Sequence, residues 1–248
     1  MSTDIAVPYP TGGLIRANTA PGWMRDLLAV SSFDHDMWED SFKGDQLRAI
    51  YPAAKTNGTS AAVTFTEHNA GGFLELVSGT DNAGYAGQGV GLNWTGDRGV
   101  LFEAIIVLPA AITTMKFEVG LSDADDDAGA VNQKATATTA TATDFAVFCF
   151  DTSDDANIAF ITAKAGVVVE NQDLIAAVAS GVYRVAIRVD GDNVKAWLND
   201  NLIVIGAGGG AGIEGGNKLT PWAFVQARAG AASRTVQIRK WRVSQPAY

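Results

Sequence analysis

The sequence predicts an all-β fold, a sandwich or jelly roll built as one body domain. Apolar and polar residues alternate over short segments, turn residues recur at close intervals, and helical periodicity is almost absent. The chain has 248 residues, of which 27 are glycine, and its hydrophobic fraction of 47% is enough for a full core. All-β domains of this length commonly form a single unit.

The first 37 residues differ from the rest of the chain. Prolines and glycines interrupt them, yet they are rich in large apolar side chains. Such a segment is too apolar for a solvated tail and too interrupted for a domain, so we expect residues 1–37 to form an extended N-terminal arm that lies on another surface. Residues 38–248 are the predicted sandwich. The candidate anchors of the arm are Tyr9, Leu14, Trp23, Leu27 and Leu28.

The body shows a series of short β-type segments separated by turns. The clearest hairpin joins residues 183–189 to residues 194–198 through Asp190-Gly-Asp-Asn193, whose residues tolerate positive φ. Residues 136–143 predict an extended loop or weak edge strand, and residues 172–179 predict the one short helix of the body. The predicted strands cover residues 72–77, 100–108, 114–121, 144–150, 157–162, 166–170, 183–189, 194–198, 202–205, 222–227 and 235–243.

Charge and composition exclude several classes of function. The net charge of −9 argues against binding to nucleic acid, which needs clustered Lys and Arg. No apolar stretch approaches the length of a membrane span, and the first residues lack the pattern of a signal peptide. The one cysteine, Cys149, lies in the apolar run 145–150, so we expect a core residue and not a nucleophile.

Three segments resemble the concanavalin A-like lectin/glucanase superfamily, including its laminin-G-like branch. They are the strand pair 101–108 and 115–122, the hairpin 183–199, and the closing region 219–243. The resemblance covers roughly residues 38–243. It implies a jelly-roll sandwich of two antiparallel sheets, but no particular activity.

The carboxylates of the body do not form the pattern that glycosidases of this superfamily carry. Those enzymes place acids two or more residues apart on one strand, and two carboxyls must flank the scissile bond. Glu75, Glu103 and Glu118 are each the only acid on their strand. Glu103 and Glu118 remain a candidate pair across strands, although Lys116 shares the face of Glu118. We therefore predict that the chain is not an enzyme.

Three groups of polar or aromatic residues are candidate binding sites. The acidic run with Asp123, Asp125 and Asp127 offers oxygen ligands that suit Ca²⁺, the one candidate cofactor, although a solvated acidic loop has the same pattern. Tyr85 and Trp94 are candidates for stacking on a sugar, or they cap the core. His35, in the run Asp34-His-Asp36, is a candidate metal ligand or proton shuttle, but it has no second His or Cys nearby and favours a polar junction between arm and body, whereas His68 indicates a turn.

The whole chain also resembles capsid decoration and head-fibre proteins of tailed bacteriophages. The resemblance rests on the arm, on the absence of a signal peptide and on the Gly/Ala/Thr-rich body. It implies a non-enzymatic structural virion protein on the capsid surface, made in the host cytoplasm. Its partners would be the major capsid protein and copies of itself, with a trimer as one candidate oligomer. The alternative is a lectin-like carbohydrate-binding module, Ca²⁺-dependent or not, that binds a glycan of the host surface.

Overall fold

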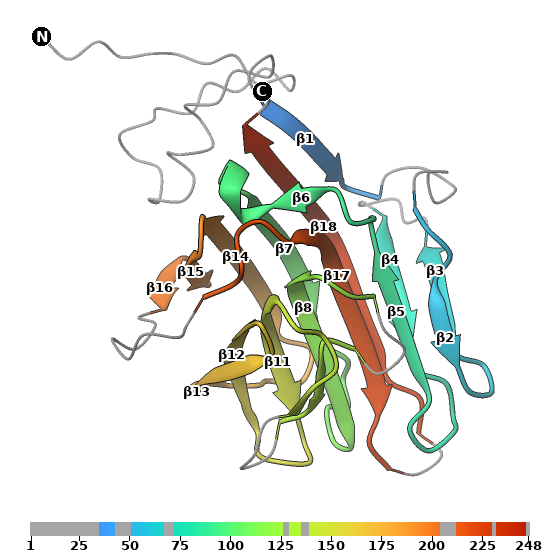
Figure 1. The fold of residues 1–248 in the computed structure, drawn as a ribbon. Helices are drawn as coiled ribbons and strands as arrows, with labels where there is room; N and C mark the ends of the chain where they lie inside the picture. Colours follow the sequence, from blue (N-terminus) through green and yellow to red (C-terminus); the bar gives the residue numbers. More distant parts are fainter. Residues whose placement is uncertain are drawn as a thin grey trace, which may run out of the picture.

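A computed structural model of the chain shows two antiparallel β-sheets packed face to face (Figure 1). The structure describes residues 35–42, 51–66, 72–125, 129–134, 139–203, 212–229 and 232–246. This arrangement confirms the predicted all-β jelly-roll sandwich. The arm residues Tyr9, Leu14, Trp23, Leu27 and Leu28 lie outside the described residues.

The first sheet, here called sheet I, has eight strands and contains the last strand of the chain. Seven strands run in the order β16 (Asn201–Ile203), β15 (Asn193–Leu198), β14 (Val182–Asp190), β7 (Leu101–Val107), β18 (Thr235–Pro246), β4 (Phe73–Val77) and β3 (Ala62–Thr66). The eighth, β1 (His35–Asp40), pairs antiparallel with the second half of β18, with Trp38 opposite Val243.

The second sheet, sheet II, also has eight strands. Seven run in the order β13 (Val167–Ala176), β12 (Asn157–Lys164), β11 (Phe145–Asp151), β8 (Met115–Ser122), β17 (Lys218–Ala227), β5 (Tyr85–Gly89) and β2 (Lys55–Asn57), while β6 (Trp94–Thr95) pairs with β17. A 3₁₀ turn, η2 (Gly96–Arg98), follows β6, and the short pair β9 (Val131–Gln133) and β10 (Thr139–Ala140) lies in the connection from β8 to β11.

The main hydrophobic core fills the space between the sheets. Alternate residues of β7 and β14, such as Phe102 and Ile187, point into it, together with Phe117 and Phe148 of sheet II. On the outward face of β7, Glu103, Ile105 and Val107 are only partly buried, whereas Leu101 at the start of the strand is buried. Sheet I thus has one packed face and one face open to solvent, as the alternation of its strands predicts.

Both faces of sheet II are buried at its central strands. Every residue of β8 and of β11 is buried, although successive side chains point to opposite faces. A second hydrophobic cluster, which includes Val147, Trp222 and Phe224, covers the face turned away from sheet I. This explains why residues 145–150 form a continuous apolar run.

The predicted hairpin at residues 183–198 is confirmed. Asp190 pairs with Asn193, so Gly191 and Asp192 form the two-residue turn, and Gly191 has a φ of 57°. Gly fits this position because it adopts positive φ without steric penalty.

The predicted helix at residues 172–179 is wrong. Residues up to Ala176 continue β13, and Ile175 and Ala176 pair with Ile158 and Asn157 of β12. Pairing with a neighbouring strand outweighs the weak helical preference of the segment. No helix within the described ranges has the length and hydropathy needed to cross a membrane.

The close approach of β8 and β11 predicts that Gly120 cannot be replaced. A Cβ atom at residue 120 would collide with the carbonyl oxygen of Ala146 and lie 2.8 Å from Cα of Val147. Gly120→Ala should therefore lower the free energy of unfolding by about 1–3 kcal/mol, measured by urea denaturation. Gly216→Ala is the control, because its nearest neighbour, Oδ2 of Asp97, would be 3.5 Å away. Equal stabilities of the two variants would contradict this account.

Candidate functional site

A buried ion pair occupies the centre of sheet II, on the face turned away from sheet I. Lys116 and Glu118 are alternate residues of β8, and their side chains are 0% and 1% exposed. Nζ of Lys116 lies 3.4 Å from Oε2 of Glu118. The sequence had suggested that the two share a face, and this is confirmed. A charged pair at such depth needs further hydrogen bonds to offset its lost hydration.

The Glu118 carboxylate accepts hydrogen bonds from two segments distant in sequence. Its Oε1 accepts from Nε1 of Trp222 at 2.8 Å and from the backbone N–H of Ala130. Its Oε2 accepts from the backbone N–H of Val131 at 3.0 Å. Lys116 donates to the carbonyl oxygen of Val131, and its Nζ lies 4.8 Å from the ring centroid of Phe224. The charges of the pair are thus fully engaged.

Residues 129–134 and 139–143, here called the cover segment, lie over this ion pair. Ala130, Val131 and Ala142 are buried in the second hydrophobic cluster, against sheet II. Asp123, which follows β8 directly, holds one end of the segment, because its carboxylate accepts hydrogen bonds from the backbone N–H and the hydroxyl of Thr143, at 3.2 and 2.5 Å.

A second charged network holds the other side of the cover segment. The carboxylate of Asp151 accepts hydrogen bonds from Arg228 and from the backbone N–H of Lys134. Burial alone would raise the pKa of Asp151, but the bonds from Arg228 and the N–H groups of Ser153 and Lys134 hold this pKa below its ordinary value. Lys134 in turn binds Asp154 at 2.9 Å and Asp155 at 3.0 Å.

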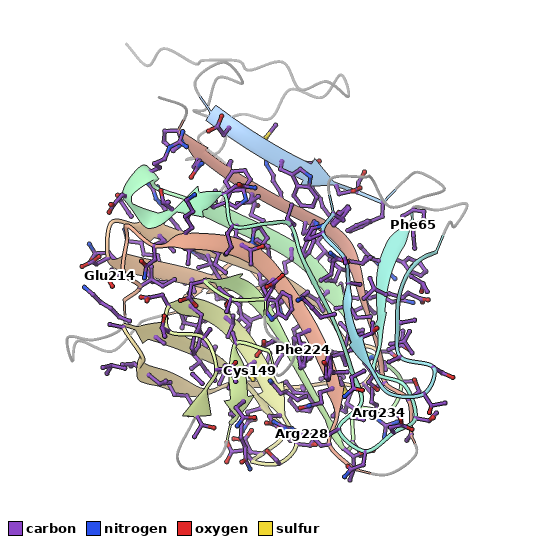
Figure 2. All side chains as sticks on the ribbon, turned by 45° about the vertical axis from the view of Figure 1, so that its right-hand side comes forward. Phe65, Cys149, Glu214, Phe224, Arg228 and Arg234 are labelled. Atoms are coloured by element: carbon purple, nitrogen blue, oxygen red, sulfur yellow. The ribbon has the colours of Figure 1, made fainter. Side chains whose placement is uncertain are left out.

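Cys149 lies beside the ion pair but is chemically inert. The strand register places it opposite Glu118, which in turn lies opposite Phe224, and Figure 2 labels Cys149, Phe224 and the nearby Arg228. Burial raises the pKa of the Cys149 thiol far above its ordinary value. A thiol that stays protonated cannot act as a nucleophile, which agrees with the expected core role.

Glu103 and Glu118 do not form the acid pair considered from the sequence. Glu118 is on the outward face of sheet II, beneath the cover segment, whereas Glu103 of β7 lines a pocket on the outer face of sheet I. The two carboxyls therefore lie on opposite sides of the sandwich, and no substrate bond fits between them. The sequence alone does not show that β7 and β8 belong to different sheets.

The pocket on sheet I has a volume of about 210 Å³ and an open mouth. Its lining includes Glu103 and Ile105 of β7, Arg184 of β14, Trp197 of β15 and Lys240 of β18. Burial raises the pKa of Glu103 to about 7, against the lowering effect of Arg242 and Lys240. Its Oε2 is buried and accepts no hydrogen bond from any residue that the structure describes. Sequence reasoning missed this pocket, because its residues come together only through the strand register.

Tyr85 and Trp94 do not form a stacking shelf. Tyr85 is 8% exposed and stacks on Phe224 in the second cluster, with ring centroids 5.5 Å apart. Trp94 is 7% exposed and belongs to the core between the sheets. The two rings therefore lie on opposite faces of sheet II, and both cap hydrophobic cores.

The acidic run is only partly within the described residues. Asp123 holds the cover segment, Asp125 is half-buried, and Asp127 lies outside the described ranges, as does His68. Across the described part of the chain, no three His, Cys, Asp or Glu side chains gather in a way that could hold a metal ion.

The chain has a jelly-roll sandwich fold, and solved lectins and glucanases have the same fold. Similar solved structures include a peanut lectin, with a TM-score of 0.56 at 10% identity over 87% of this chain and 99% of the lectin. A family 16 glycoside hydrolase endo-glucanase from Bacteroides ovatus gives 0.55 at 8% identity over 83% of this chain and 99% of the enzyme.

A third similar structure is a protein of unknown function from Shewanella oneidensis MR-1, with a TM-score of 0.58 at 12% identity. The match covers 90% of this chain and 93% of that one. No family model and no curated protein sequence matches the chain. At these identities the likeness establishes the fold, which lectins and glucanases share.

Removing the negative charge of Glu118 should strongly destabilise the fold. Glu118→Gln keeps the shape but leaves the Lys116 ammonium buried without its counter-charge, so we expect a loss of about 3–5 kcal/mol in urea denaturation. Glu39→Gln is the control, because Glu39 pairs with Lys240 at 3.2 Å and is 33% exposed. It should lose less than about 1 kcal/mol. Similar losses in both variants would refute a structural role for the buried pair.

The raised pKa of Glu103 predicts that the free energy of unfolding falls as pH rises. Its folded pKa of about 7 lies above the ordinary value of 4.5, so the folded chain binds this proton more tightly than the unfolded chain. The stabilisation is complete below pH 4.5 and is lost as pH rises through 7. Glu103→Gln should therefore be more stable than the wild type at pH 8, by on the order of 2 kcal/mol, and nearly equal at pH 4.5. Thermal unfolding across this range would measure it, and a pH-independent difference would contradict it.

Proposed function

We propose that the chain is a non-enzymatic structural protein of a bacteriophage virion, which displays a lectin-like jelly roll on the capsid surface. The observation that carries the non-enzymatic part is the cover segment over Glu118. The carboxylate is completely engaged by Trp222, Ala130 and Val131, so it has no capacity left to protonate or attack a substrate.

In this proposal, residues 1–37 attach the body to the major capsid protein. Tyr9, Leu14, Trp23, Leu27 and Leu28 supply apolar area, which contributes about 25 cal/mol per Å² when buried. Self-association, with a trimer as the proposed oligomer, would multiply weak contacts into firm attachment.

The junction between arm and body supports a mechanical role. β1 (His35–Asp40) begins within the last three residues of the arm and pairs with the C-terminal strand β18, beside the C-terminus in Figure 1. Arg98 fixes this junction, since it binds Asp36 at 2.8 Å and the carbonyl oxygen of Pro246 at 2.6 Å. A pull on the arm therefore acts along a strand ladder, whose hydrogen bonds share the load.

Carbohydrate binding is the second candidate function. The pocket on sheet I favours it, because an aromatic ring lies there beside the partly exposed side chains of Arg184 and Lys240. The target would be a glycan of the host surface. The proposed Ca²⁺ dependence rests on the acidic run alone.

Replacing the apolar anchors should abolish attachment without unfolding the body. In the full chain, Trp23→Asp combined with Leu27→Asp is expected to prevent self-association and binding to purified capsids, because charged residues cannot be buried at an apolar contact. Analytical ultracentrifugation and co-sedimentation with capsids would measure this, and circular dichroism would verify the fold. Val167→Asp, at an apolar residue of the body that is 63% exposed, is the control. Retained oligomers and capsid binding in the double variant would overturn the attachment role.

A further inference from the structure

The pocket on the outer face of sheet I is formed by a step in side-chain size. Across neighbouring strands, Trp197 lies opposite Ala186, and Ala186 lies opposite Glu103. Ala186 is 3% exposed and is too short to fill the space between its two neighbours. Because strands lie about 4.8 Å apart, Trp197 and Glu103 stand roughly 10 Å apart across this floor, enough for one small ring.

The walls of the pocket combine an apolar face with paired hydrogen-bonding groups. Trp197 and Ile105, both half-buried, supply the apolar surface, and Arg184 and Lys240 supply donors. Arg184 also pairs with Asp200 at 3.5 Å, and the Arg184 side chain remains 60% exposed. Lys240 is similarly only partly engaged by Glu39, with 38% of its side chain exposed.

The charges of the lining balance. Arg184 pairs with Asp200 and Lys240 pairs with Glu39, so each base of the lining already has a carboxylate beside it. Glu103 carries only part of a negative charge near neutral pH, because burial raises its pKa to about 7. Neither a cation nor an anion therefore meets a full uncompensated charge in this pocket. The balance therefore favours a ligand without net charge.

The unpartnered oxygen of Glu103 specifies what that ligand must carry. Oε2 is buried and accepts no hydrogen bond within the described residues. A buried oxygen without a partner is costly, and the Glu103 carboxyl lines the pocket, so a ligand gains affinity by bringing an O–H or N–H to this carboxyl group. A purely apolar ligand would leave the oxygen unsatisfied and is disfavoured.

We propose that this pocket binds one neutral sugar ring, stacked on Trp197, with a hydroxyl that donates to Glu103 and another that accepts from Arg184 or Lys240. A sugar ring has one apolar face and a rim of hydroxyls that both donate and accept, which matches this lining. The inference rests on the second candidate function, carbohydrate binding, and assigns its site to sheet I. It is independent of attachment through the arm.

The test begins with the full chain on an array of neutral and acidic oligosaccharides, followed by titration calorimetry with the best neutral glycan. Trp197→Ala and Glu103→Gln should each weaken binding about tenfold or more, since one removes the stacking surface and the other the charged acceptor. Lys195→Ala is the matched control, because Lys195 is exposed on the same strand and is not part of the lining. It should bind within about twofold of the wild type.

Two other results would overturn the assignment in distinguishable ways. If the wild type binds a neutral glycan and both Trp197→Ala and Glu103→Gln bind it with unchanged affinity, the proposed site is wrong but carbohydrate binding stands. If the wild type binds no neutral glycan, both proposals are wrong. Near-ultraviolet circular dichroism of each variant ensures that lost binding does not reflect a lost fold.

Discussion

The Glu118 carboxylate is the point at which three separate segments of the chain meet. It lies on β8, accepts from the indole of Trp222 on β17, and accepts from the backbone of the cover segment at Ala130 and Val131. An apolar pair in place of Lys116 and Glu118 could supply comparable stability. Only a carboxylate, however, can satisfy three buried N–H groups at once, and these would otherwise be unpaired. The buried charge therefore determines where the cover segment lies, and this placement determines which surfaces the molecule offers.

Because the cover segment closes sheet II, the two sheets have different physical roles. The central strands of sheet II are buried on both faces, so they are mostly apolar, and their polar residues are internal ties, such as Asp151 with Arg228. Sheet I keeps an outer face in solvent, where alternate residues are polar, aromatic or half-buried. A fold that lectins and glucanases share can thus present its accessible chemistry on the sheet opposite the covered one. The pocket described above lies on that open face of sheet I.

The sequence predicted what depends on neighbouring residues and failed where distant strands decide. Alternation of apolar and polar residues identified β8, β14 and β15. The Asp190–Asn193 turn identified the hairpin of β14 and β15, because both signals are local. The helix expected at 172–179 failed, since pairing with β12 decided its conformation. Tyr85 and Trp94 were grouped because they are close in sequence, yet β5 and β6 direct them into different cores. The bond between Glu118 and Trp222 spans 104 positions, and the pocket combines residues of β7, β14, β15 and β18, so neither follows without the strand order.

Attachment and recognition, if both belong to this chain, meet at neighbouring residues of sheet I. β1 leads from the arm into the sheet, and its Glu39 pairs with Lys240 at 3.2 Å and with Arg242 at 3.7 Å. Lys240 lines the pocket, and both bases lower the pKa that burial raises at Glu103. A displacement of β1 along β18 would therefore move Glu39 away from Lys240 and Arg242 and change the charge around the pocket. A carboxyl with a pKa of about 7 responds to such a change near neutral pH, because a small shift in local potential alters its ionised fraction there most strongly. The register of β1 on β18 thus connects the start of the described chain with the pocket on sheet I.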